Sequence, residues 1–400
     1  MRLLHIADLH LGLAGRTEDL RRCWLHACEI AAEREVDVVI VAGDVFHGRD
    51  PDAQALTAFH SGLRVLGENG DIPVLLIAGN HDGAAHPGRR SVLEVFDGAD
   101  VDVVTSPRVV TVGGTRIACL PWVSRQQLMA SNPGMSRAGA VQSMADGLER
   151  VLDKLRTEGA DVLTAHWSVQ GAVLGNERDI AIVGQDEVVL PIASIEGPWS
   201  YAALGHIHGQ QSGELQSTSW AYSGSVDRMN FGEEHERKYA IERDLESWDT
   251  SLHELPARLF VTVDYLDDWS DYTGNDTDVE GAFVRIRAKV TEGRDTAQLY
   301  AHERELRAQG AASVQVQPEI VRETRARAER VTTALSVNEA MDEWMDMRGL
   351  DGRKKHDLRK LVAELEQDDA GAVVGGAHDG DASPVDAGSS PAPRSEEVHA

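Results

Sequence analysis

Five short apolar runs in this sequence each end in a polar turn that carries aspartate, asparagine or histidine. The clearest run is residues 74–77, which lies between Pro73 and the turn Gly79-Asn80-His81-Asp82 and has the length and flanks of a buried parallel strand. Open α/β sheets bind ligands at the carboxyl ends of such strands, so five polar strand ends predict a functional site. The other four runs, residues 3–7, 38–41, 161–165 and 201–204, end in Asp8-Leu9-His10, Gly43-Asp44, His166 and Gly205-His206-Ile207-His208.

Helical patterns separate these runs up to about residue 125. Apolar residues recur three or four positions apart over 20–31 and again over 55–66. This alternation of strand and helix predicts an α/β fold with a parallel sheet. We expect strands over 108–112 and 115–120 around a Gly113-Gly114 hairpin turn, a helix over 137–158, and strands near 181–190, 201–205, 218–222 and 238–243, which together form a two-layered β-sandwich flanked by helices.

The pattern changes near residue 259. We expect a small α+β module here. It contains strand-like runs at 259–266 and 283–290, a helix over 295–309 and a strand over 313–317, which we expect Pro318 to end. Ser336-Val337-Asn338-Glu339 is a capping box that opens a helix, and a second helix follows with an apolar stripe. The composition of residues 368–400 predicts disorder. We therefore expect four parts, which are the sandwich 1–258, a capping module 259–332, a helical segment 333–367 and an acidic tail 368–400.

The charge balance limits how the chain could act on nucleic acid. It has 39 basic and 66 acidic residues, and its formal net charge is −27. DNA-binding proteins gain affinity by neutralising phosphates, so metal ions or a partner would have to supply much of the attraction for DNA. No apolar run approaches the roughly 18 residues of a membrane span. We see no signal peptide and no disulfide framework among the three cysteines, and we therefore expect a cytoplasmic protein without membrane association.

The polar side chains at the strand ends are nitrogen and oxygen ligands that suit manganese, iron or zinc. Alternate residues of an extended segment share a face, so Asp8 with His10, and His206 with His208, can point at one ion. Asp44 has two carboxylate oxygens and can bridge two ions. Seven ligands are too many for one ion and suit two, for which we expect manganese, with iron and zinc as alternatives. The predicted ligands are Asp8, His10, Asp44, Asn80, His166, His206 and His208.

Two ions about 3.5–4 Å apart clamp a phosphoryl group and lower the pKa of a water. His81 is next to a ligand without being needed as one, so we expect it to donate a proton to the leaving group, which is worth about 10²–10⁴-fold in rate. A lone histidine on a strand is more often a satisfied core residue, and we interpret His5 in that way. His47 follows Asp44 by three residues. Two roles stay open for His47, namely contact with the substrate and support of the metal ligands.

Taken together, these motifs resemble those of the calcineurin-like metallophosphoesterase superfamily. The resemblance implies the β-sandwich flanked by helices, and it implies that His81 is the catalytic acid and that Asp44 bridges two metals. It further implies that Asp8, His10, Asp44 and His208 hold one metal, and that Asp44, Asn80, His166 and His206 hold the other.

Within the superfamily the chain resembles the SbcD-type nucleases, which act with the coiled-coil ATPase SbcC in double-strand-break repair. The similar stretches are residues 2–12, Gly43-Asp44-Val45-Phe46-His47 and Tyr222-Ser223-Gly224-Ser225. This resemblance implies a DNA exonuclease or endonuclease of repair and recombination, with DNA and an SbcC-like ATPase as partners, and it leaves homodimer formation open. The residues that we expect to contact the ATPase are Trp344, Leu358, Leu361, Val362 and Leu365.

A second hypothesis is a phosphomonoesterase or cyclic-nucleotide phosphodiesterase that acts alone on small molecules with the same metals. A relative with an inactive site is disfavoured, because every expected ligand is present. The extension over 259–366 favours the nuclease, since an enzyme for small molecules needs no exposed pair of helices. The negative charge argues against unaided DNA binding.

Overall fold

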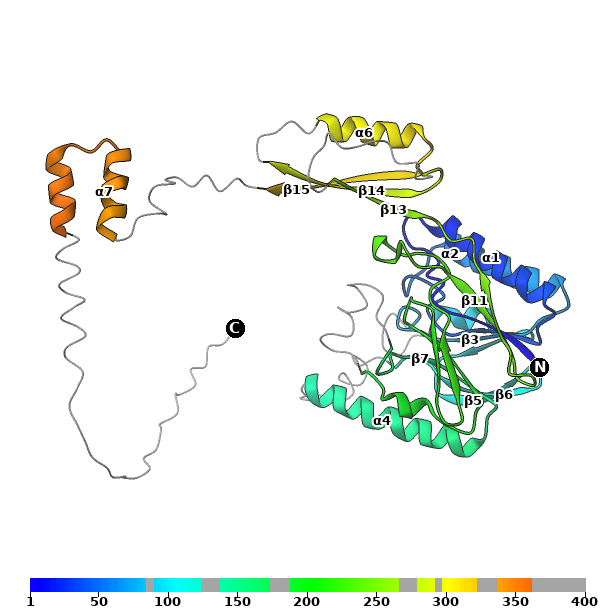
Figure 1. Cartoon of the computed structure of the whole chain (residues 1–400). Coiled ribbons are helices and arrows are strands. Elements are labelled where there is room, and N and C mark those ends of the chain that lie inside the picture. The colour runs from blue at the N-terminus through cyan, green and yellow to red at the C-terminus, as the bar shows by residue number, and fades with distance from the viewer. Residues whose placement is uncertain are drawn as a thin grey trace, which may run out of the picture. The chain divides into compact units, whose positions relative to one another are not determined.

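The computed structural model describes residues 1–83, 90–123, 137–172, 188–265, 279–291, 297–321 and 337–361. The chain divides into two compact units, Met1–Val321 and Arg322–Ala400. The first unit contains two six-stranded sheets and a third sheet of three strands (Figure 1). The α/β sandwich expected from the sequence is confirmed.

The first sheet has a parallel centre and one antiparallel edge. Strands β1 to β4 run parallel to one another, and β11 and β12 continue the sheet beyond β1 in antiparallel pairing. The spatial order is β12 (Thr250–Glu254), β11 (Tyr239–Asp244), β1 (Arg2–Ile6), β2 (Val38–Val41), β3 (Val74–Ile77) and β4 (Val101–Val104).

The second sheet is also mixed. Its central strands run parallel, and β5 and β6 form the predicted hairpin, in which Val112 pairs with Thr115 across Gly113-Gly114. The spatial order is β5 (Arg108–Val112), β6 (Thr115–Leu120), β7 (Val162–His166), β8 (Tyr201–Gly205), β10 (Ser219–Tyr222) and β9 (Gln211–Glu214).

Three hydrophobic cores hold these layers together. One lies between the two sheets, a second lies between the first sheet and the helices α1 (Thr17–Glu33) and α2 (Ala53–Glu68), and a third lies between the second sheet and α4 (Arg137–Glu158). Successive strand residues alternate between cores: Leu3 contributes to the core between the sheets, and Leu4 to the core under the helices. Burial on both faces explains why these strands are continuous apolar runs in the sequence.

Helix α2 shows how local sequence fixes an element beside the site. Asp52 caps it, because its carboxylate accepts a hydrogen bond from the backbone N–H of Ala55 at 2.8 Å. Trp24 of α1 stacks on Phe59 of α2 with ring centroids 5.4 Å apart and donates from Nε1 to the Phe59 carbonyl at 2.9 Å. The pair α1–α2 is thereby fixed against the first sheet, beside the strand ends that carry the polar turns.

The third sheet belongs to the expected α+β module. Strands β13 (Phe260–Tyr265), β14 (Phe283–Thr291) and β15 (Ser313–Val321) pair in parallel, and with α6 (Ala297–Ala308) they enclose a separate core. The prediction that Pro318 ends the last strand is wrong, because Pro318 pairs with Ala288 inside β15. Since β15 is the edge strand of the described sheet, no described strand on its other side requires a hydrogen bond from Pro318, which lacks an N–H.

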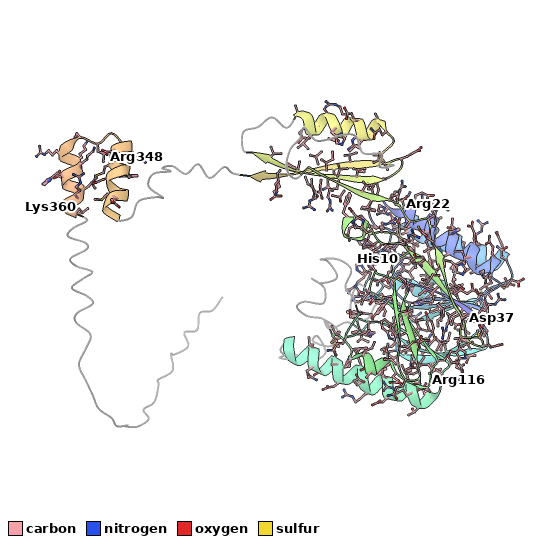
Figure 2. All side chains as sticks on the ribbon, in the orientation of Figure 1. His10, Arg22, Asp37, Arg116, Arg348 and Lys360 are labelled. Carbon is pink, nitrogen blue, oxygen red and sulfur yellow. The ribbon has the colours of Figure 1, made fainter. Side chains whose placement is uncertain are left out.

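Three strands were not expected from the sequence, namely β4, β9 and β12. The expected strand near 181–190 lies largely outside the described residues, as does the acidic tail 368–400. The described residues of the first unit also include three short 3₁₀ helices, at Val92–Phe96 (η1), Ile192–Ile195 (η2) and Phe231–Glu233 (η3). Its charged residues Arg22, Asp37 and Arg116 lie on the surface, whereas His10 is buried (Figure 2).

The second unit contains α7 (Val337–Met347) and a helical stretch over 352–361. Met345 of α7 is fully buried, whereas Arg348 and Lys360 are exposed (Figure 2). The boundaries expected at 258, 332 and 367 stay predictions. Within the described ranges, no helix has both the length and the apolar character that crossing a membrane requires.

Candidate metal centre

The predicted ligands follow strands β1, β2, β3, β7 and β8, and the structure brings them together where the carboxyl ends of both sheets meet. Asp8 and His10 follow β1, Asp44 follows β2, and Asn80 follows β3. The second sheet supplies the other ligands. They are His166, the last residue of β7, and His206 and His208 directly after β8.

The backbone at several of these positions has the left-handed conformation that side-chain-bearing residues rarely adopt. The φ angle is 53° at Asp8, 46° at His10, 53° at Asp44 and 103° at His206. Such conformations cost free energy and cluster at functional sites. They turn the chain sharply after each strand, and this coincidence with the predicted ligands is an independent sign of a site.

Asp44 lies at the centre of the group. Its Oδ2 is 3.5 Å from His166 Nε2, 3.8 Å from His10 Nε2 and 4.0 Å from His81 Nε2. Its Oδ1 accepts a hydrogen bond from the backbone N–H of His81 at 2.8 Å. The Asp44 side chain is almost completely buried, so its charge faces these groups with little screening by water.

Two smaller clusters flank Asp44. On one side, Nε2 of His10 is 3.2 Å from Nε2 of His208, and ligand atoms of Asp8 lie within 4.8 Å of both rings. On the other side, Asn80 Oδ1 is 3.1 Å from His166 Nε2 and 3.0 Å from His206 Nδ1. The four-plus-four arrangement expected from the sequence is thus geometrically available, with Asp44 between the two sets.

The His10 ring provides a test of whether the cluster fits a cation. It is buried, and its Nδ1 has no hydrogen-bond partner within the described part of the chain. Its Nε2 faces the nitrogen of another imidazole. Buried polar atoms are nearly always satisfied, so a ring with these surroundings fits a site that a cation completes.

The charges around Asp44 point the same way. Burial alone would raise the pKa of Asp44, but His166 and His10 hold it well below its usual range. Burial lowers the pKa of His166, and the neighbouring Asp44 carboxylate outweighs that effect and raises it to about 9. Burial holds the pKa of His10 well below its usual range. The ionised carboxylate of Asp44 and the neutral imidazole of His10 are both suitable ligands for a divalent ion. The raised pKa of His166 shows that the surroundings of Asp44 favour positive charge.

Hydrogen bonds to backbone carbonyls fix two of these histidine rings. His166 Nδ1 donates to the carbonyl of Ala42 at 2.7 Å, and His81 Nδ1 donates to the carbonyl of His47 at 2.6 Å. Because a carbonyl only accepts, the proton in each case is on Nδ1, and Nε2 faces Asp44. Ring orientation of this kind is typical of metal-binding histidines.

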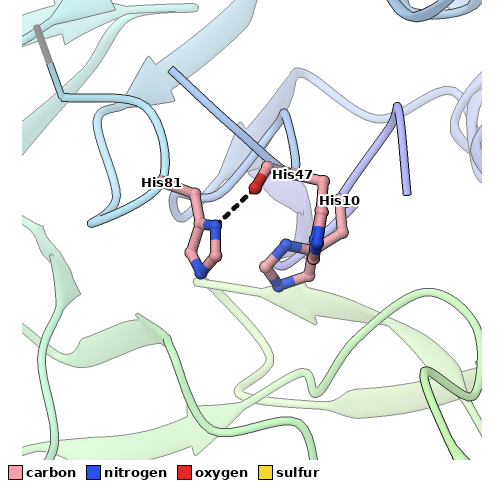
Figure 3. Close-up of side chains that lie close together, drawn as sticks. All are labelled: His10, His47 and His81. Atoms are coloured by element: carbon pink, nitrogen blue, oxygen red, sulfur yellow. Dashed lines mark hydrogen bonds between the residues drawn. The ribbon is translucent and has the colours of Figure 1, made fainter. Parts of the chain in front are cut away.

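His47 and His81 lie beside His10 (Figure 3). The His47 and His81 rings stack with centroids 5.4 Å apart, and the ring of His10 is 4.9 Å from that of His81. Ligand atoms of all three histidines lie within 4.8 Å of one another. His47 therefore lies next to the candidate proton donor. This position is compatible with contact to the substrate and with support of the ligands, the two roles that the sequence left open.

Two glycines let the loops approach this closely. A Cβ at Gly43, whose φ is +98°, would lie 2.1 Å from Nδ1 of His166, and a Cβ at Gly79 would lie 2.1 Å from Oδ1 of Asp44. Both positions therefore exclude a side chain. Gly43 and Gly79 belong to motifs recognised in the sequence, and their role is to admit the ligands to one site.

Sequence reasoning missed several residues that contact the ligand loops or rings, among them Asp82, Trp122 and Glu233. Asp82, which is fully buried, accepts hydrogen bonds from three backbone N–H groups. Trp122 stacks on the His206 ring with centroids 5.5 Å apart, and Glu233 accepts from His208 Nδ1 at 3.2 Å. Asp82 had a signal in its Gly-Asn-His-Asp turn. Trp122 and Glu233 had none, because their partners are distant in sequence.

The residues predicted to bind a partner lie in the second unit. Trp344 and Leu361 have 44% and 54% of their surface exposed, and Leu358 is half-buried. Val362 and Leu365 lie outside the described residues. Two large apolar side chains are thus available on this unit.

Comparison with known proteins agrees with the site. A family model described as calcineurin-like phosphoesterase matches residues 1–210. The SbcD component of the nuclease SbcCD of Bacillus subtilis (strain 168) is 26% identical over 249 residues, which cover 58% of this chain and 63% of that protein, so the match spans less than two thirds of the relative.

Two solved structures share lower similarity. The phosphopantetheinyl hydrolase PptH from Mycobacterium tuberculosis is 15% identical, with a TM-score of 0.31, over 56% of this chain and 88% of that one. A dimetal phosphatase from Danio rerio is 12% identical, with a TM-score of 0.40, over 64% and 96% of the two chains.

Proposed function

The chain belongs to the calcineurin-like phosphoesterase family, and from that premise we propose that it is a two-metal DNA nuclease of the SbcD type. The observation that carries the choice of DNA is its 26% identity to the SbcD component of a nuclease SbcCD over 249 residues, a match longer than the 210 residues of the family model. The α+β module and the helical second unit support the same choice, because an enzyme for small molecules needs neither.

We assign the ligands to two metal positions that share Asp44. Asp8, His10 and His208 complete one position, and Asn80, His166 and His206 complete the other. The short distances between the ligand atoms in each set support this assignment. Mixed nitrogen and oxygen donors suit manganese, iron or zinc, and we propose manganese as the metal.

A pair of divalent ions, when bound, would lower the pKa of the attacking water and stabilise the charge at the phosphoryl group. The protein orients the ligands and supplies the acid. His81 donates from Nδ1 to the His47 carbonyl, so in its protonated form it carries a second proton on Nε2, which faces Asp44. This proton passes to the leaving oxygen as the phosphorus–oxygen bond breaks. We assign His47, which stacks on His81, to contact with the substrate.

The acidic character of the chain supports a role for a partner. With 39 basic against 66 acidic residues, the chain has no basic surplus with which to hold DNA alone. We propose that an SbcC-like coiled-coil ATPase binds the second unit and supplies affinity for DNA. The three cysteines are buried thiols, which agrees with work in a reducing cytoplasm.

An assay on three substrates tests this function. Linear duplex DNA, bis(p-nitrophenyl) phosphate and p-nitrophenyl phosphate are incubated with the full chain and manganese, with and without the ATPase. We expect degradation of DNA and of the diester that depends on the metal. Hydrolysis of the monoester alone, with DNA untouched even when the ATPase is present, would establish the alternative of a small-molecule phosphatase, which the net charge of −27 favours.

A further inference from the structure

A buried ion pair lies directly behind His208. Glu233, at the end of η3, is fully buried, and its Oε2 is 2.7 Å from Nζ of Lys238, which is 1% exposed. Lys238 is among the largest fully buried side chains of the described residues. Removing two charges from water is costly, so burial of such a pair is a poor way to gain stability alone.

Both members of the pair contact His208. Glu233 Oε1 accepts from His208 Nδ1 at 3.2 Å, and Lys238 Nζ donates to the His208 backbone carbonyl at 3.0 Å. Glu233 therefore restrains the ring, and Lys238 restrains the backbone of the same residue. A carboxylate only accepts, so the bond requires the proton of His208 on Nδ1 and leaves the lone pair on Nε2.

The Nε2 atom is the one that faces the site. It is 3.2 Å from Nε2 of His10, and His208 forms one cluster of candidate ligands with His10 and Asp8. His166 and His81 are oriented by backbone carbonyls, which no substitution removes. The ring of His208 is instead bonded to a side chain, that of Glu233.

The segment that carries Glu233 is also held by the α+β module. The rings of Phe231 and Phe260 meet at 4.9 Å, the guanidinium of Arg285 lies 4.6 Å from the Phe231 ring centroid, and Glu234 forms an ion pair with Arg285 at 3.8 Å. Contacts with the module on both sides of Glu233 in the sequence, at Phe231 and Glu234, thus hold the segment from which Glu233 reaches His208.

We propose that Glu233 and Lys238 are positioning residues that fix the tautomer and ring orientation of His208, and so set the affinity of the one metal position that His208 serves. This inference rests on the proposed function, in which His208 is a metal ligand. Carboxylates that orient metal-binding histidines change metal affinity by about 10–100-fold when removed.

Glu236 offers a matched control. Its carboxylate also lies 2.7 Å from Lys238 Nζ, but its bond goes to the lysine and not to the His208 ring. Glu233→Gln and Glu236→Gln therefore each remove one negatively charged partner of Lys238. Only Glu233→Gln also changes the group that accepts the hydrogen bond from the His208 ring. Manganese binding by the full chain is measured by titration calorimetry, with thermal unfolding as the check on folding.

We expect Glu233→Gln to weaken one of two manganese sites about 10–100-fold and leave the other unchanged. Glu236→Gln should bind both ions as the wild type does. Wild-type affinity at both sites in a folded Glu233→Gln protein, or equal loss at both, overturns the inference. If the wild-type chain binds no manganese, the proposed function fails instead.

A second measurement does not depend on the folding of the Glu233 and Glu236 variants. Long-range ¹⁵N NMR of the metal-free wild-type chain reports which nitrogen of His208 carries the proton, with His208→Gln for assignment. We expect the proton on Nδ1. A proton on Nε2 overturns the inference whatever the variants do.

Discussion

The carboxylate of Asp82 accepts a hydrogen bond from the backbone N–H of Val45 at 3.1 Å and so ties the loop after β3 to the loop after β2. The same carboxylate accepts from Phe46 at 3.0 Å and from Gly79 at 3.1 Å. Val45 directly follows Asp44. The separation between Asp44 and the ligand turn after β3 is therefore set by a residue that is not a ligand.

We expect Asp82→Asn to destabilise the protein by about 1–3 kcal/mol, because the amide offers one acceptor oxygen where the carboxylate offers two and turns an N–H₂ group toward backbone donors. Urea denaturation of the metal-free chain measures the loss. Asp97, an exposed carboxylate that accepts one bond from the Val103 N–H, is the control. An equal loss in Asp97→Asn would show that Asp82 has no special role.

His5 should make stability depend on pH. It is fully buried between the sheets, Nε2 donates to the Leu204 carbonyl at 3.1 Å, and Nδ1 accepts from the Tyr201 hydroxyl at 2.9 Å. Burial lowers its pKa to about 3. Below a pH of about 6.5 the unfolded chain therefore binds a proton that the folded chain does not, so stability falls as pH falls toward 3, by about 2 kcal/mol between pH 7 and 5.

His5→Gln should remove this contribution, since glutamine does not titrate. Urea denaturation at pH 7 and pH 5, in the presence of a chelator, gives the change for each protein. His26→Gln, at a half-exposed position on α1, should keep the wild-type dependence. If His5→Gln loses as much stability over this interval as the wild type, His5 is not the group responsible.

The sequence predicted those parts of the fold whose packing produces a local pattern of apolar residues. Strands β1, β2 and β3 are buried on both faces and therefore form continuous apolar runs. The missed strand β12 has an exposed, polar pattern, and β9 is a Gln-Ser-Gly-Glu segment at a sheet edge. Such edges are specified by the neighbouring strand, which a single segment does not reveal.

The same distinction applies to the site. The predicted ligands stand directly after apolar strands, so topology alone brings them together. Glu233 and Lys238 were missed, because the sequence does not distinguish a buried ion pair from a solvated one. The feature that distinguishes this pair is its contact with His208, which lies 25 residues from Glu233. The placement of Pro318 inside β15 likewise depends on which side of the strand has a neighbour.

The bridging and acid roles should separate by mutation. Asp44→Ala removes the carboxylate that lies between both clusters, so both manganese sites should weaken by more than about 100-fold. His81→Gln should bind manganese as the wild type does and lose about 10²–10⁴-fold in kcat, because only the proton donor is lost. Calorimetry and a nuclease assay measure the two effects. Wild-type cleavage by His81→Gln would refute the assignment of the acid.

Affinity for DNA should depend on the partner. The isolated chain, with its net charge of −27, should bind duplex DNA with a Kd weaker than about 10⁻⁶ M at physiological salt. Addition of the coiled-coil ATPase should lower the Kd sharply. Fluorescence anisotropy of a labelled duplex over a range of salt concentrations measures both. Tight, steeply salt-dependent binding by the chain alone would contradict the partner requirement.

The helical second unit should provide the contact with that partner. Leu361 is 54% exposed and Trp344 is 44% exposed, whereas Met345 is fully buried. An aspartate at Leu361 therefore removes an apolar contact without opening the interior of the unit. Burial of a leucine contributes about 1.5–3 kcal/mol, so Leu361→Asp should weaken association with a co-expressed ATPase at least tenfold, and Leu361→Asp with Trp344→Asp should abolish it.

Two controls distinguish a docking surface from a structural one. Arg353→Asp changes the charge at an exposed position of the same helix and should keep the partner. Met345→Asp places a charge in the interior and should unfold the unit, which circular dichroism reports. Leu361→Asp should keep both its helical signal and its metal-dependent cleavage. If it loses helicity and yet still co-purifies with the ATPase, Leu361 is part of the fold of the unit, and the contact with the partner lies elsewhere.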